Sequence, residues 1–331
     1  MKKLSTVLLI LFLSTLLITA FTACDKLKID NLKANKHFKA GNKFYTEEKY
    51  KKAITEYEAA LQLNPNLKSA FYYLGSSYIM VYKPGDDTEK NKEYGAKAVE
   101  NLTKALELDP ENKNIIQSLG DINDKMGNFD QAEKYYLMMQ KFTPNDPATY
   151  FTLAGFYNNN QKYDKAIEMY EKRIALDPAN PEGYLYLADF YQTKRKWDEA
   201  IKNHELRIAK IGESSLDEKE KNDVLAEAYY RLGVVCWNKS YQTPPDVMSP
   251  VERLQVVEQG FNALKKATDL SPNFPDPWAY MGLLYKQKEI AEPLKVAEYE
   301  KQYKAMIDKF QELRKRKLAT EQFIKDLAKE K

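Results

Sequence analysis

The chain contains few residues of the kinds that carry out nucleophilic, acid–base or metal chemistry. Its only histidines are His37 and His204, and its only cysteines are Cys24 and Cys236. Zinc sites and disulfide frameworks need clusters of such residues, so these counts argue against both. The sequence also lacks a glycine-rich phosphate loop, a metal-binding pair of histidines and a nucleophilic serine turn. It predicts that the protein is not an enzyme and holds no metal or cofactor.

Charge and composition narrow the choice of partners. The 331 residues include 51 Lys and Arg against 48 Asp and Glu, which gives a net charge of +3. Two of the positive charges are Lys2 and Lys3, so the body of the chain is nearly neutral. A nucleic-acid footprint needs a concentrated basic excess, so we expect no nucleic-acid partner.

Proline residues recur along the chain at a fixed spacing. Pro110, Pro144 and Pro178 are 34 residues apart, and each follows a stretch with helical periodicity. A proline stops one helix and is tolerated in the first turn of the next. The chain is therefore predicted to consist of repeated pairs of helices.

Between these turns the order aromatic-x-x-Leu-small-x-x-aromatic recurs. In one copy, Tyr184, Leu187, Ala188 and Tyr191 fall on a single helix face because residues three and four apart are neighbours. The small residue allows a neighbouring helix to approach closely. Such a helix pair has two apolar faces and cannot bury both alone, so the pairs must stack. Stacking also accounts for most of the 24 tyrosines as packing residues.

The period and the pattern together resemble the tetratricopeptide repeat over residues 34–300. The resemblance implies an all-α fold, a right-handed superhelix of about seven helix pairs with a C-terminal capping helix. We expect the charged residues 301–331 to form that last helix. Two insertions are expected between the helices of their pairs, near 83–92 and 238–250. The expected first residues of the pairs are Ala34, Lys68, Lys113, Pro147, Pro181, Ala226 and Pro275.

Cys236 and the two histidines occupy positions of the repeat pattern where packing side chains are expected. Cys236 replaces the second aromatic of its copy and is predicted to be a buried, unreactive thiol. His37 and His204 also stand where packing side chains belong, so we interpret neither as a catalytic base. A catalytic role for the chain would require a pair of buried acids, which the pattern does not predict.

The first residues have the pattern of an export signal. Lys2 and Lys3 precede an apolar run that extends to residue 23, as in secretory signal peptides. Residues 21–24 (Phe-Thr-Ala-Cys) resemble the lipobox of bacterial lipoproteins, although Phe21 stands where leucine is usual. The resemblance implies that residues 1–23 are removed and that Cys24 is acylated. An uncleaved membrane anchor and an ordinary secreted protein are the alternatives.

Acylation would place the protein in the bacterial cell envelope, anchored to a membrane and facing the periplasm or the cell exterior. Several acyl chains, at ~0.8 kcal/mol per buried methylene, would make the attachment effectively permanent. Residues 24–33 are polar and rich in lysine, and we expect them to form a short tether.

The tetratricopeptide resemblance also implies where partners bind. In that family the first helices of the pairs line a concave groove that holds peptide segments. Here only Lys125 and Lys286 would bring positive charge to the groove, which disfavours capture of a terminal carboxylate. Amides, acids and aromatics suit an extended polypeptide with aromatic or mildly basic character. The candidate partner-binding residues are Asn42, Tyr45, Tyr72, Gln117, Asp121, Phe151, Asn158, Asp189, Tyr230 and Trp237.

The best prediction is a membrane-anchored scaffold that binds protein partners through this groove. The pattern leaves its oligomeric state open. A glycan- or small-ligand-binding lipoprotein is the alternative, for which Trp237, Trp278 and the Pro244-Pro245 insertion are the candidate contacts. The basic run from Arg314 to Lys317 is either a solvated helix end or a contact for anionic lipid or an acidic partner.

Overall fold

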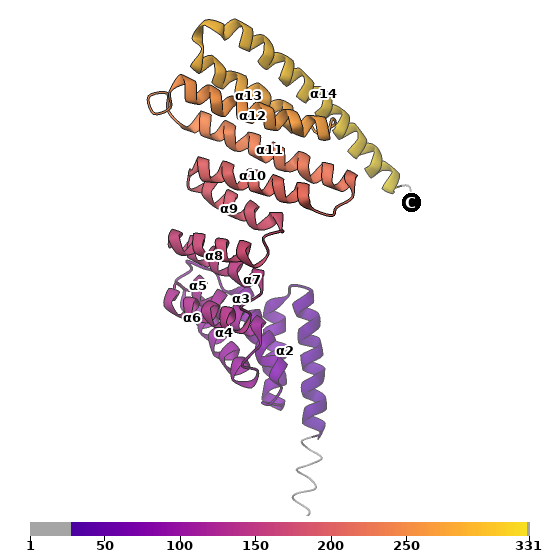
Figure 1. The fold of residues 1–331 in the computed structure, drawn as a ribbon. Helices are drawn as coiled ribbons and strands as arrows, with labels where there is room; N and C mark the ends of the chain where they lie inside the picture. Colours follow the sequence, from indigo (N-terminus) through magenta and orange to yellow (C-terminus); the bar gives the residue numbers. More distant parts are fainter. Residues whose placement is uncertain (1–27, 330–331) are drawn as a thin grey trace, which may run out of the picture. The chain divides into compact units, whose positions relative to one another are not determined.

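The computed structural model describes residues 28–329 and divides into two compact units at the Lys162–Tyr163 boundary. Within the described residues every regular element is a helix, so the predicted all-α fold is confirmed. We call the two parts the N-terminal unit and the C-terminal unit (Figure 1).

The N-terminal unit contains the first three predicted helix pairs and the first helix of the fourth. Its first helix is described over residues 28–46. The helices that follow are α2 (Tyr50–Leu63), α3 (Lys68–Val81), α4 (Glu89–Leu108), α5 (Lys113–Lys125), α6 (Phe129–Phe142) and α7 (Pro147–Asn159). The core of this unit is built from small and large residues in alternation, such as Ala53 and Ala98 against Tyr57, Leu74 and Leu102.

The C-terminal unit contains the remaining helices. Its helices are α8 (Tyr163–Leu176), α9 (Pro181–Thr193), α10 (Trp197–Glu213), α11 (Glu218–Gln242), α12 (Pro250–Leu270), α13 (Asp276–Ala291) and α14 (Val296–Lys329), with a 3₁₀ turn at Pro293–Lys295. In Figure 1 the helices from α9 to α14 follow one another as antiparallel layers.

The three regularly spaced prolines lie in turns between helices, as predicted, and two of the helices that follow begin with a further proline. Pro147 and Pro181 occupy the first turns of α7 and α9, where a missing N–H has no partner to lose. The preceding Asp146 and Asn180 cap these helices through their side chains. Short polar turns of this kind set the repeat length.

The small residues of the repeat lie where neighbouring helices touch. A Cβ atom added at Gly75 would lie 2.7 Å from Leu102 Cγ, and one added at Gly233 would lie 2.4 Å from Leu264 Cγ. These distances are too short for a side chain at either position unless the leucine opposite it shifts. The glycines therefore set the close contacts of α3 with α4 and of α11 with α12.

The tyrosines pack between helices and also bond across them. The Tyr150 hydroxyl donates to the Pro144 carbonyl at 2.8 Å, and Tyr184 donates to the Pro178 carbonyl at 3.1 Å. These two bonds occupy the same place in successive repeats, 34 residues apart. Tyrosine thus supplies apolar area and holds the turn before its own helix.

One expected boundary is corrected by the structure, since residues 28–33, expected in a tether, belong to the first helix. The charged residues from 301 onward form a helix as expected, and this helix continues the last repeat helix within α14. Neither segment contains glycine or proline, so nothing local stops the helix. Packing along α14 also continues to Leu313, which is only 3% exposed. The last repeat helix and the expected capping helix are one element.

The two insertions appear partly as loops and partly as longer helices. The irregular stretches are residues 82–88 and 243–249, and the remaining inserted residues lengthen α4 and α11. The second loop ends at a capping box, in which Ser249 caps α12 and Glu252 bonds back to the Ser249 backbone.

A buried arginine holds this second loop. Arg253 is 2% exposed and donates to the Ser240 carbonyl, to the Thr243 carbonyl at 2.8 Å and to Gln287 Oε1 at 3.1 Å. One side chain therefore joins the end of α11, the start of the loop and α13.

The buried thiol is as predicted. Cys236 is fully buried, and burial raises its pKa to about 12, so it stays protonated and unreactive. The predicted signal segment, residues 1–23, and Cys24 lie outside the described residues. Between residues 28 and 329, no helix is both long and apolar enough to cross a membrane.

Candidate functional site

Two of the predicted groove residues in the N-terminal unit bond within their own helix pair. Asn42 accepts a hydrogen bond from the Tyr57 hydroxyl at 2.8 Å, and Asp121 accepts one from Tyr136 at 2.6 Å. Burial raises the pKa of Asp121, although the Tyr136 bond opposes this shift. Both side chains therefore join the first helix of a pair to the second.

Two other predicted residues belong to a tyrosine cluster. The ring of Tyr73 lies 5.7 Å from that of Tyr45 and 5.2 Å from that of Tyr72. Tyr72 and Tyr73 also line a cavity of about 520 Å³ where α3 meets the end of α4 and the start of α5. Burial raises the pKa of the Tyr45 hydroxyl, which keeps it neutral. The structure thus brings Tyr45 and Tyr72 together through Tyr73.

The remaining predicted residues of this unit lie on α5 and α7. Gln117 is exposed on α5. Phe151 and Asn158 are seven residues apart and share one face of α7. Phe151 is 39% exposed, and the buried Oδ1 of Asn158 has no hydrogen-bond partner among the described residues.

In the C-terminal unit, the predicted residues Asp189 and Tyr230 line one cavity of about 280 Å³. We call it the α9–α11 cavity. Its lining comes from α9, α10, α11 and the turn before α13, and consists of Asp189, Gln192, His204, Glu227, Tyr230, Arg231, Val234 and Phe274.

A charged network runs beside this cavity. Glu227 accepts hydrogen bonds from Arg231 on its own helix and from Arg207 Nη2 of α10, the latter at 2.8 Å. Arg231 Nη1 lies 3.8 Å from Asp189 Oδ1. Burial would raise the pKa of Glu227, but these arginines outweigh it and hold the pKa below its ordinary value. Burial raises the pKa of Asp189, whose contact with Arg231 is looser.

His204 contributes a neutral imidazole to the same cavity. The residue is 1% exposed, and neither ring nitrogen has a partner within the part of the chain that the structure describes. Burial, reinforced by the charges of Arg207 and Arg231, lowers its pKa to about 4. The predicted packing position is confirmed, but the side chain also brings unused hydrogen-bonding capacity to the cavity.

Trp237 does not line this cavity but is linked to it through other aromatic rings. Its ring stacks on Tyr241 at 5.0 Å and meets Tyr280 edge-on at 5.3 Å. The Tyr280 ring in turn lies 5.6 Å from that of Tyr230. Aromatic contacts therefore connect Trp237 to Tyr230.

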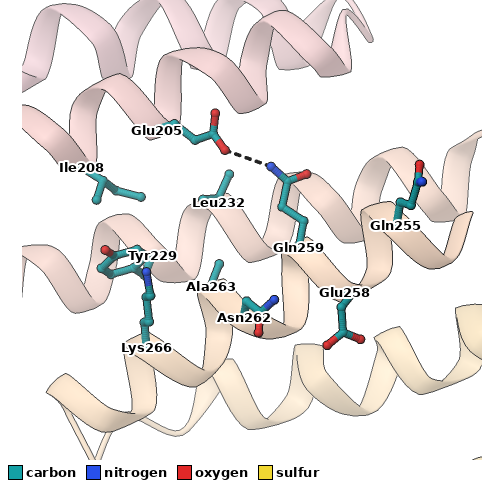
Figure 2. A pocket seen from close by; sticks show the side chains of 10 residues that line it. All are labelled: Glu205, Ile208, Tyr229, Leu232, Gln255, Glu258, Gln259, Asn262, Ala263 and Lys266. Carbon is teal, nitrogen blue, oxygen red and sulfur yellow. Dashed lines mark hydrogen bonds between the residues drawn. The ribbon is translucent and has the colours of Figure 1, made fainter. Parts of the chain in front are cut away.

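A larger cavity, of about 710 Å³, lies between α10 and α12 with α11 at its base (Figure 2). Figure 2 shows Glu205 and Gln259 pointing toward each other across it, and Gln259 Nε2 donates to Glu205 Oε1 at 3.0 Å. None of the predicted groove residues lines it, because they were predicted on first helices and most of this lining comes from the second helices α10 and α12. The available signal was a polar stripe at helical spacing on α12, formed by Gln255, Gln259, Asn262 and Lys266.

The positively charged residues on the first helices also differ from those that were expected. Lys286 was expected to be a groove cation, but it pairs with Glu289 at 3.2 Å and with Glu300. Arg231 was not singled out, although it lines the α9–α11 cavity. The signal for it was the Glu227-x-x-x-Arg231 spacing, which places an acid and a base together on one helix.

Comparison with known proteins matches three parts of the chain to repeat models. A model described as TPR repeat matches residues 41–80, and two described as Tetratricopeptide repeat match residues 95–155 and 147–190.

The fold is similar to solved structures of repeat proteins. One is the C-terminal part of a TPR repeat-containing protein from Cytophaga hutchinsonii, which is 19% identical with a TM-score of 0.52. That match covers 80% of this chain and 94% of the other. A weaker match is the solved structure of pilF of Pseudomonas aeruginosa, which is 14% identical with a TM-score of 0.43; this match covers 75% of this chain and 96% of the other.

One curated relative, Protein bimA of Emericella nidulans, is 26% identical over 127 residues. These residues make up 38% of this chain and 14% of the relative, so the chain spans a small part of that protein's length.

Proposed function

We propose that this chain, which contains tetratricopeptide repeats, is a non-enzymatic scaffold that binds extended segments of protein partners on the first helices of its pairs. The main support is the α9–α11 cavity, where aromatic walls stand beside buried polar groups that have no partner in the described chain. Polar groups of a bound segment would satisfy them, while its apolar side chains pack on the rings. The tyrosine cluster around Tyr73 gives the N-terminal unit an aromatic contact surface of its own.

The double variant Tyr72→Ala, Trp237→Ala tests this function. Aromatic anchors dominate binding energy at protein interfaces, so we expect partner capture to fall at least about tenfold. The measurement is a quantitative crosslinked pull-down of the full chain from its own membranes, with helical content checked by circular dichroism.

A matched control is Phe129→Ala, Phe142→Ala, which removes two exposed aromatics of α6, a second helix. Capture by this control should remain at the level of the unmodified chain. Unchanged capture by the folded Tyr72, Trp237 variant would show that the partner does not bind on these first-helix aromatics.

We also propose that the scaffold is a lipoprotein of the bacterial cell envelope, held to a membrane through acylated Cys24 and facing the periplasm or the cell exterior. The support is the sequence of residues 1–24, with its positive start, apolar run and terminal cysteine. The proposed partners are other envelope proteins.

The mass of the mature N-terminus tests the anchor. We expect a mature chain that begins at acylated Cys24. We expect Cys24→Ala to prevent both the acylation and the removal of residues 1–23. The Cys236→Ala variant is the control, because its thiol is buried and should not affect processing. An intact N-terminus that still carries Met1 would contradict the proposed anchor.

Glycan binding is a second candidate function, supported by one observation. Tyr241 is 63% exposed and stacks on Trp237 at an interplanar angle of 13°, beside the loop that contains Pro244 and Pro245. A flat exposed aromatic pair is the type of surface on which a sugar ring packs. Glycan binding that is lost with Trp237→Ala, together with no protein capture, would favour this function over the scaffold.

A further inference from the structure

Two buried side chains near the α9–α11 cavity carry polar atoms that have no hydrogen-bond partner in the described part of the chain. His204 lines the cavity and is 1% exposed, and both of its ring nitrogens are unpartnered. Arg207 is 8% exposed, and its Nε and Nη1 are unpartnered although Nη2 binds Glu227. Buried polar groups are almost always satisfied, so the nitrogens of His204, which lines the cavity, point to a ligand that bonds to them.

The positively and negatively charged side chains around the α9–α11 cavity are equal in number. Arg207 and Arg231 face the carboxylates of Asp189 and Glu227, which cancel them when both are ionised. An anionic ligand would lie against the two carboxylates, and a cationic ligand would lie against the two arginines. A neutral polar group avoids both repulsions and the cost of burying a further charge.

The hydrogen-bonding groups require a ligand that both donates and accepts. Glu227 already accepts from two arginines, whereas Asp189 Oδ1 is 3.8 Å from Arg231, too far for a hydrogen bond. Asp189 can therefore accept from a ligand. His204 is neutral at neutral pH, with one nitrogen that donates and one that accepts. A primary amide matches this set, because its oxygen accepts and its NH₂ group donates twice.

The size and walls of the cavity fit a single side chain. Its volume of about 280 Å³ lies below the range of about 300–1,000 Å³ that is usual for whole small-molecule sites. Tyr230, Val234 and Phe274 form apolar walls, and the rings of Tyr230 and Phe274 meet at 5.1 Å. These walls suit the methylene groups of a side chain whose end is polar.

We propose that the α9–α11 cavity binds the primary amide of an Asn or Gln side chain in a bound peptide segment, with Asp189, His204 and Arg231 as its hydrogen-bonding partners. This inference rests on the proposed peptide-binding function and adds the chemistry of one side chain to it.

The histidine rings give a direct test because the full chain has only His37 and His204. The chain is labelled with ¹⁵N-histidine, and the ring signals are followed during titration with propionamide. We expect a saturable shift of the His204 ring signals and no shift of those of His37, which lies in the N-terminal unit. Propionate and propylammonium, which have similar shapes but carry charge, should bind at least about tenfold more weakly.

N-methylacetamide distinguishes a side-chain amide from the peptide backbone. It is a secondary amide, and we expect a weaker response than with propionamide because it has one N–H donor fewer. An equal or stronger response would assign the cavity to backbone and overturn the side-chain proposal. A stronger response to either charged probe, or no response of His204 to any probe, would also overturn it.

A pair of aspartate variants completes the test. Asp189→Ala should weaken the propionamide response about tenfold, whereas Asp198→Ala, which removes a carboxylate that is 80% exposed on α10, should leave it unchanged. Equal responses of both variants and the unmodified chain would contradict the assigned role of Asp189. If the probes fail while partner capture still depends on Tyr72 and Trp237, the scaffold function stands and the amide site does not.

Discussion

Replacement of Arg253 by methionine is expected to lower the free energy of unfolding of the C-terminal unit by about 2–6 kcal/mol, because two buried acceptors lose their donor. Methionine keeps an unbranched apolar side chain but donates no hydrogen bond. The carbonyls of Ser240 and Thr243 and the amide oxygen of Gln287 would lose their donor, and Ser240 and Gln287 are buried. Each buried acceptor left unsatisfied costs about 1–3 kcal/mol.

Urea unfolding followed by circular dichroism measures this loss, and hydrogen exchange locates it. We expect faster exchange of the amides in residues 243–249 and at the end of α11, because Arg253 ties both to α13. Arg314→Met is the control, since Arg314 is exposed on α14 and should change stability by less than about 0.5 kcal/mol. A stability of Arg253→Met equal to that of the control would show that the loop does not depend on this side chain.

Acid is expected to destabilise the C-terminal unit through His204. Its pKa is about 4 in the folded chain against 6.5 for an ordinary histidine. The unfolded chain therefore binds the proton first as the pH falls, so stability is lost between 6.5 and about 4 and returns as the pH rises. At about pH 5 the expected loss relative to about pH 7.5 is about 2 kcal/mol, from 1.36 kcal/mol per pKa unit.

The groups that set this loss face His204 from two helices. Arg207 lies on α10 with His204, while Glu227 and Arg231 lie on α11. The two arginines oppose protonation and Glu227 favours it, but burial is the largest influence.

Urea midpoints at the two pH values, compared between the unmodified chain and His204→Gln, measure the effect. The variant should lack this part of the acid destabilisation, whereas His37→Gln should keep it, because the His37 side chain is 41% exposed. The same pH dependence in His204→Gln and the unmodified chain would place the titrating group elsewhere.

The repeat architecture could be predicted because its rules are local. Proline spacing and the small residues at positions such as Gly75 and Gly233 indicated repeated helix pairs, and the described helices follow in that order along the chain. A turn or a close helix contact needs particular residue types at a fixed spacing, so a single sequence records it.

Boundaries without a local stop could not be predicted in this way. The first helix includes residues 28–33, where composition suggested a tether. A helix without glycine or proline ends only where packing or solvent ends it, and that depends on the rest of the fold.

The sequence predicted which helices carry the candidate site residues, but not which hydrogen-bond partners those residues have. The repeat register placed Asp189 and Tyr230 on first helices, and both line the α9–α11 cavity. The same register gave Asn42 and Asp121 to the groove, whereas their oxygens bond to tyrosines of the paired helices. Which polar group is already satisfied depends on the neighbour across the helix pair.

The sequence by itself determined the repeat period, the pairing of helices and the burial of Cys236, because each follows from spacing along one chain segment. Only the tertiary structure decided that His204, Arg231 and Asp189 surround one cavity, because they come from three different helices. Their distances, burial and charge balance arise from packing between repeats. The chemistry proposed for the cavity is therefore a property of the folded chain.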